Sequence, residues 1–97
     1  MLTSQAVEKT LRDIFPYLKE KFHVSKIGYF GSYARNEQTT GSDIDILVDF
    51  YKAPGWDFFT LEEFLEKTFN RRVDLVTRAA LKKPLQEEIL SQVRYID

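Results

Sequence analysis

Residues 24–50 read VSKIGYFGSYARNEQTTGSDIDILVDF, two apolar segments separated by a polar one. The first segment, 24–30, is short and rich in β-branched and aromatic residues, which is typical of a strand. In the second segment, 43–50, apolar side chains alternate with mostly acidic ones. This alternation predicts a half-buried strand whose apolar face carries Ile44, Ile46, Val48 and Phe50. Residues 36–42 are polar, lack a period and are predicted to be a loop.

A long helix is predicted before this pair of strands. Apolar residues recur every three or four positions from the predicted cap, Thr3 or Ser4, to Phe22. Pro16 interrupts that pattern and lacks an amide donor. It is therefore expected to kink the helix or to split it near Asp13.

The remaining residues add elements of both kinds. In order, we expect a short helix at 33–37, a turn at 53–55, a helix capped by Asp57 with its stripe at 58–69, a strand at 72–76, a helix at 84–93 and an extended tail at 95–96. This mixture predicts an α+β fold, with a small mixed β-sheet and helices packed against it. With 97 residues, the chain is expected to form a single domain over 1–97.

Composition excludes several classes of site. The chain has no Cys, which excludes disulfides, thiol nucleophiles and Cys-bound metals, and its one His, His23, cannot build a His-rich metal site. The net charge of −1 lacks the basic excess of a free-standing nucleic-acid binder, so direct nucleic-acid binding is not indicated. No apolar run approaches the roughly 20 residues that span a bilayer, and residues 1–4 do not resemble the start of a signal peptide. We therefore expect a cytoplasmic protein that does not enter the membrane.

Carboxylates are the candidate catalytic groups. Asp43 and Asp45 lie two positions apart on the predicted strand, so their side chains project from one face with Cα atoms roughly 6.6 Å apart. Asp74 lies between apolar residues on the third strand and can point to the same side. Such a set could share two divalent ions of the kind that assist phosphoryl transfer. Taken alone, Asp43 and Asp45 could also be a solvated strand face, and Asp74 a polar residue on a half-exposed strand.

A phosphate-binding turn is predicted where the first strand ends. Gly31 permits close approach of a ligand to the backbone, and Ser32 offers a hydroxyl, although Ser32 could serve only as a helix cap. Arg35, one turn further on, could contact a phosphate or pair with Glu37 or a nearby Asp.

These motifs resemble one known family. GSYAR at 31–35, SDIDILV at 42–48 and VDLV at 73–76 resemble the minimal nucleotidyltransferases of the DNA polymerase β superfamily, with ten residues between Ser32 and Asp43. The resemblance covers roughly residues 4–94. It departs from the family at Asn36, where Gly is frequent. The resemblance implies a polymerase β-like nucleotidyltransferase fold.

The resemblance also implies roles for the motif residues. Asp43, Asp45 and Asp74 would be catalytic and would bind Mg²⁺, two ions in all, and Asp74 would help to deprotonate the attacking hydroxyl. Nucleotide binding would involve Gly31, Ser32, Arg35 and Ser42. The reaction would move AMP from ATP to a hydroxyl of a macromolecular acceptor, with pyrophosphate as leaving group. Small members are typically antitoxins paired with a HEPN-domain ribonuclease toxin, and some adenylylate a tyrosine of that toxin.

Two other functions compete with protein modification. One is a non-catalytic antitoxin or nucleotide-binding module that acts by direct contact with its partner. The other is a small-molecule transferase, akin to the aminoglycoside-modifying members of the superfamily, but those enzymes use an additional domain to hold the acceptor.

Several residues outside the motifs have two interpretations. Trp56 and Phe59 fall off the apolar stripe of their helix, so they are either tucked under the 54–55 turn or exposed as a partner surface. Tyr33 is either a core residue or a neighbour of the nucleotide base. His23 is expected at the solvated end of the first helix. A solvated helix face or the rim of a partner site would explain Lys82, Lys83, Glu87 and Glu88.

Overall fold

A computed structural model describes residues 2–96 of the chain. Its elements, in chain order, are α1 (Ser4–Phe22), β1 (Val24–Phe30), α2 (Gly31–Ala34), β2 (Ile44–Phe50), α3 (Asp57–Phe69), β3 (Val73–Thr77), the 3₁₀ helix η1 (Arg78–Ala80), α4 (Lys83–Gln92) and β4 (Arg94–Tyr95). The strands form one four-stranded sheet in the order β3-β2-β1-β4. Because β1 runs antiparallel to β2 and β4 while β2 runs parallel to β3, the sheet is mixed, as predicted.

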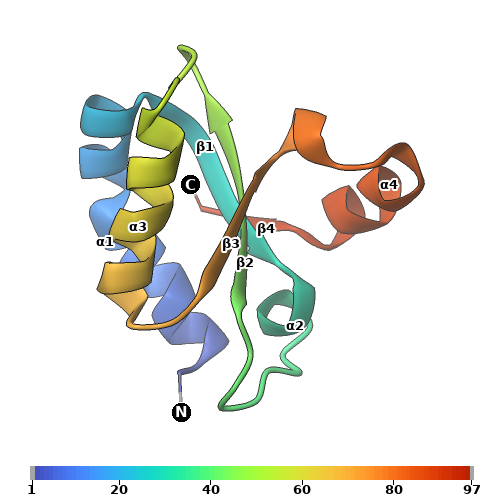
Figure 1. Cartoon of the computed structure of the whole chain (residues 1–97). Coiled ribbons are helices and arrows are strands. Elements are labelled where there is room, and N and C mark those ends of the chain that lie inside the picture. The colour runs from blue at the N-terminus through green and yellow to red at the C-terminus, as the bar shows by residue number, and fades with distance from the viewer. Residues whose placement is uncertain (1, 97) are drawn as a thin grey trace.

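The helices divide between the two faces of the sheet. Figure 1 shows α1 and α3 side by side on one face, with α2 and α4 on the other side. Ile44, Ile46 and Val48 of β2 belong to the hydrophobic core on the α1 and α3 face, as the alternation predicted. Since side chains alternate along a strand, Asp45 and Leu47 point to the opposite face, toward α2 and α4.

The first helix differs from its prediction at Pro16. The α1 helix is assigned as one helix with Pro16 inside it, so the predicted split near Asp13 is wrong. Pro16 is exposed, and the apolar stripe buries residues on both sides of it, from Val7 to Phe22. Packing of both halves on the same sheet outweighs the lost hydrogen bond. The cap is Thr3, whose side chain accepts a hydrogen bond of 3.0 Å from the amide of Ala6.

Other element boundaries shift by one or two residues. The α2 helix begins at Gly31, two residues earlier than predicted, and ends at Ala34. Asp43 precedes β2, and β3 starts and ends one residue later than predicted. Asp57 lies in the first turn of α3 rather than at its cap, where Trp56 stands without a side-chain hydrogen bond. The η1 helix was not predicted.

The expected C-terminal tail is a strand. Arg94 and Tyr95 pair with Tyr29 and Gly28 of β1. Gly28 makes this pairing possible, because a Cβ atom there would lie 2.6 Å from the carbonyl oxygen of Arg94. The sequence signal for β4 was weak because the strand is only two residues long.

Two glutamates of α3 protect the outer edge of β3. Glu66 accepts a hydrogen bond of 3.1 Å from the amide of Val73, and Glu62 accepts one of 3.5 Å from the amide of Leu75. Since β3 is the last strand on its side of the sheet, these amides have no neighbouring strand. Side chains thus occupy donors that an edge strand would otherwise expose.

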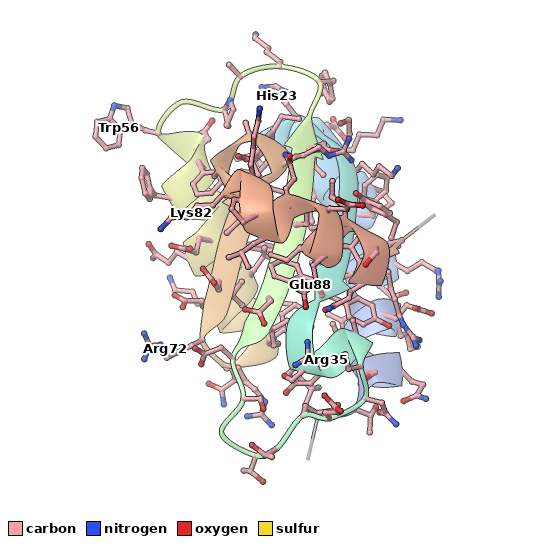
Figure 2. The ribbon with its side chains drawn as sticks, turned by 90° about the vertical axis from the view of Figure 1, so that its right-hand side faces the viewer. His23, Arg35, Trp56, Arg72, Lys82 and Glu88 are labelled. Carbon is pink, nitrogen blue, oxygen red and sulfur yellow. The ribbon has the colours of Figure 1, made fainter. Side chains whose placement is uncertain are left out.

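The structure decides between the alternatives for Trp56, Phe59 and Tyr33. Trp56 and Phe59 are 85% and 59% exposed, so the tucked arrangement is wrong, and Figure 2 shows Trp56 projecting away from the ribbon. Tyr33 is 1% exposed and belongs to the core. His23 ends α1 in the left-handed conformation, and its ring contacts the Tyr51 hydroxyl at 3.1 Å.

No helix within residues 2–96 is long and apolar enough to cross a bilayer.

Candidate active site

A cavity of about 460 Å³ opens on the face of the sheet that carries α2 and α4. Its lining comes from the end of β1, from α2, from the start of β2 and from α4, and consists of Phe30, Gly31, Ser32, Arg35, Ser42, Asp43, Asp45, Glu88, Ile89 and Gln92. Every predicted site residue except Asp74 therefore lines one cavity. Figure 2 shows Arg35 and Glu88 pointing toward one another from α2 and α4.

The sheet register brings the predicted carboxylates together. Asp45 of β2 lies directly opposite Asp74 of β3, and Asp43 lies two residues before Asp45. Asp43 and Asp74 are exposed, whereas Asp45 is half-buried. Asp74 stands beside Asp45 but outside the lining of the cavity.

Asp45 is the most buried of the three carboxylates, and its pKa is raised. Burial, then the charges of Asp74 and Asp43, raise the pKa of Asp45 to about 6, while the nearby Arg35 lowers it. A carboxylate surrounded in this way favours either a proton or a cation.

Gly31 brings the turn that was predicted to bind phosphate into close approach with Asp45. Its φ of +69° lies in the left-handed region, and a Cβ atom there would overlap Oδ2 of Asp45. Two independent requirements, backbone conformation and close approach, therefore exclude a side chain at this position. Ser32 follows, half-buried in the wall of the cavity.

Arg35 and Ser42 line the cavity and also make protein contacts. The Arg35 Nε atom donates to Glu37 over 2.7 Å, and a terminal nitrogen of the guanidinium donates to Oε1 of Gln92 over 3.2 Å. The pairing of Arg35 with Glu37, one of its two interpretations, is therefore present. Ser42 Oγ accepts a hydrogen bond of 2.9 Å from the amide of Thr39, which closes the loop before Asp43.

The α4 helix supplies lining residues that the sequence did not identify. Glu88 and Gln92 are four residues apart and Ile89 lies between them, so helix periodicity places all three near one face. The sequence could not indicate that this face of α4 meets the cavity, because that depends on how α4 crosses the sheet. The sequence around Glu88, Ile89 and Gln92 therefore contains no signal that they line the cavity.

The donor set fits a magnesium ion that is shared with a substrate. Mg²⁺ prefers oxygen ligands and is usually held by one or two carboxylates together with waters and substrate phosphates. In the part of the chain that the structure describes, no group of three His, Asp or Glu side chains could hold an ion by itself. A magnesium ion at this site would therefore take at most two of these carboxylates, such as Asp43 and Asp45 of the cavity lining, and substrate phosphates or waters would complete its coordination.

The Gly31-Ser32 turn thus packs against Asp45, and Asp43 lines the same cavity. Comparison with known proteins identifies the class of enzyme. Residues 11–96 match the family model of the nucleotidyltransferase domain. The chain belongs to the nucleotidyltransferase domain family and is a nucleotidyltransferase, so the predicted family, fold and enzyme class are confirmed.

One similar protein and two similar solved structures are more specific than the family model. The protein adenylyltransferase MntA of Thermococcus cleftensis is 43% identical over 97 residues, which are 99% of this chain and 98% of that protein. A solved structure with the provisional name minimal nucleotidyltransferase matches with a TM-score of 0.79 and 28% identity, over 96% of this chain and 95% of the other. A toxin–antitoxin structure with AMP-PNP matches with a TM-score of 0.67 and 27% identity, over 97% of this chain and 72% of the other.

Proposed function

We propose that this chain is an antitoxin that transfers AMP from ATP, with Mg²⁺ bound, to a hydroxyl of a HEPN-type ribonuclease toxin. The observation that carries the proposal is the cavity in which the Gly31-Ser32 turn meets Asp43 and Asp45. Similarity to a protein adenylyltransferase over nearly the whole chain supports transfer to a protein. Similarity to a toxin–antitoxin structure with AMP-PNP supports an adenine nucleotide and a toxin partner.

In the proposed reaction, the residues of the cavity have different roles. Transfer of AMP forms a bond between the acceptor oxygen and the α-phosphorus of ATP and breaks the bond from that phosphorus to pyrophosphate. Gly31 and Ser32 would hold the triphosphate against the sheet. Asp43 and Asp45 would hold Mg²⁺, which neutralises phosphate charge when bound.

The proton of the acceptor hydroxyl also needs a base. We assign this role to Asp74, which would share the metal with Asp45. Asp74 is exposed beside Asp45, at a position that a macromolecular acceptor can reach. A carboxylate within hydrogen-bond reach of the attacking hydroxyl can accept its proton as the new bond forms.

Label transfer to the partner tests the catalytic function. The protein is incubated with labelled ATP, Mg²⁺ and the product of the adjacent reading frame, which we expect to be the HEPN partner, and the intact mass of that product is measured. We expect mass steps of one AMP each. Replacing Asp43 and Asp45 together by Asn should lower the rate on the order of a hundredfold or more, as expected when electrostatic stabilisation of the transition state is lost. Asp49→Asn, on the same strand but outside this cavity, is the matched control.

The same variants separate catalysis from neutralisation by contact. If modification is the mechanism, the double Asn variant should still bind the toxin but no longer protect cells from it. Full protection by the double variant, or label transfer at the wild-type rate, would contradict the catalytic proposal and favour the contact antitoxin.

A further inference from the structure

The wall of the cavity formed by α4 differs chemically from the wall formed by the sheet and α2. The sheet side presents a Gly-Ser turn and carboxylates, whereas α4 presents Glu88, Ile89 and Gln92. The α4 wall therefore combines a carboxylate, an aliphatic side chain and a carboxamide. None of these groups is a cation that would attract phosphates.

A contact with Arg35 fixes the orientation of the Gln92 carboxamide. A guanidinium has only donors, so the oxygen of Gln92 must face Arg35, at the observed 3.2 Å. The carboxamide nitrogen of Gln92, with its two N–H donors, is then directed away from Arg35. Arg35 is held in turn by Glu37 at 2.7 Å, so the guanidinium is positioned from two sides.

The charge of the α4 wall determines which part of a nucleotide it can face. Glu88 is exposed in the α4 wall of the cavity, and Figure 2 shows it pointing toward Arg35 of α2. A carboxylate repels a triphosphate but accepts hydrogen bonds from sugar hydroxyls, as acidic residues do in dinucleotide-binding domains. Ile89 can pack against a base, and a carboxamide N–H can donate to a ring nitrogen or carbonyl.

We propose that the α4 wall is the nucleoside subsite, in which Glu88 accepts hydrogen bonds from the ribose hydroxyls, Ile89 packs against the base and Gln92 donates to the base. The inference rests on the proposed nucleotide substrate and adds the residues that select a ribonucleotide. The volume of about 460 Å³ falls within the range of ordinary small-ligand sites, roughly 300–1,000 Å³. In this arrangement the Gly31-Ser32 turn receives the triphosphate and the α4 residues receive the nucleoside.

Binding of two nucleotides tests the role of Glu88. Dissociation constants are measured for ATP and for 2′,3′-dideoxy-ATP, both with Mg²⁺, by calorimetry. Wild type should prefer ATP, and Glu88→Ala should weaken ATP by roughly tenfold or more, the scale of a hydrogen bond to a charged group, while leaving dideoxy-ATP unchanged. Glu87→Ala is the matched control, because Glu87 is an exposed neighbour on α4 that does not line the cavity. An unchanged preference for ATP in Glu88→Ala would overturn the proposal.

A second variant tests Gln92 without releasing Arg35. Gln92→Glu keeps an oxygen for Arg35 but removes the N–H donors. Inorganic tripolyphosphate with Mg²⁺ serves as a ligand without a nucleoside, and it also reports any repulsion by the added charge. We expect the affinity for ATP to fall several-fold more than the affinity for tripolyphosphate. An equal loss for both ligands would place Gln92 outside the nucleoside subsite.

These measurements separate the subsite from the proposed function. Both are binding experiments, so they do not depend on transfer to a partner. Absence of ATP binding in wild type would overturn the function and the subsite together. ATP binding with an unaltered preference in Glu88→Ala would overturn the subsite alone.

Discussion

At the scale of single residues, Asp45 makes the protein without metal less stable than it could be. Its pKa of about 6 in the folded chain lies above the ordinary value of 3.8. Between these values the folded chain binds more protons than the unfolded chain, so the free energy of unfolding falls as pH rises through this window. Asp45→Asn removes the ionisation. We expect it to raise the free energy of unfolding at pH 7 by about 1–2 kcal/mol, allowing for solvent screening, in urea titrations with EDTA.

The sign of this effect can be checked by pH. Below the ordinary Asp value both states are protonated, so the advantage of Asp45→Asn should shrink as pH falls from 7 toward 4. An advantage of the same size at both pH values would show that the carboxylate charge is not its cause. Residues that function requires are often unfavourable for stability, and Asp45 would be such a residue.

Gly31 gives a second prediction at this scale. Gly31→Ala should lower stability by about 1–3 kcal/mol, because the new methyl group meets a left-handed backbone and the Asp45 carboxylate together. ATP binding should weaken as well, since the turn and Asp45 must move apart. Thermal unfolding and calorimetry measure the two effects. Gly41→Ala is the control, because a Cβ atom at Gly41 would meet nothing within 4 Å. Equal behaviour of the two variants would contradict the role of Gly31.

At the scale of elements, β4 ties the C-terminal segment to the sheet. Gly28→Ala should displace it, because the methyl group would lie 2.6 Å from the Arg94 carbonyl oxygen. Amide hydrogen exchange should then accelerate at Ile96, which donates to the carbonyl of Ile27 over 2.8 Å. The amides of α1 are an internal control and should keep their protection. Unchanged exchange at Ile96 would show that β4 does not depend on the space at Gly28.

Prediction from sequence succeeded where the signal was local. The alternation in 43–50 located the strand, and the interval between Ser32 and Asp43 identified residues that line one cavity. Prediction failed where packing between elements decides. The position of Asp74 beside the cavity rather than in its lining depends on the register of β2 and β3 and on the path of α4. The contribution of Glu88 depends on that same path, and the continuity of α1 past Pro16 depends on burial on both sides.

At the scale of the whole molecule, nucleotide binding should stabilise the fold. A ligand that binds only the folded chain, at one hundred times its dissociation constant, adds about 2.7 kcal/mol to the free energy of unfolding. For a domain of this size we expect the melting temperature to rise by roughly 10–20 °C with ATP and Mg²⁺. The variant with Asn at positions 43 and 45 should show little of this shift in a thermal-shift assay. A full shift in that variant would place the nucleotide elsewhere.

The glutamate contacts along β3 restrict how this protein can assemble with others. A partner that extended the sheet at β3 would first have to displace Glu62 and Glu66 from the amides of Leu75 and Val73. The same contacts discourage stacking of copies into fibrils, which proceeds from open strand edges. The proposed toxin partner is therefore expected to contact side chains rather than to form backbone hydrogen bonds along β3. Such an interface can be altered by single substitutions without unravelling the sheet beneath it.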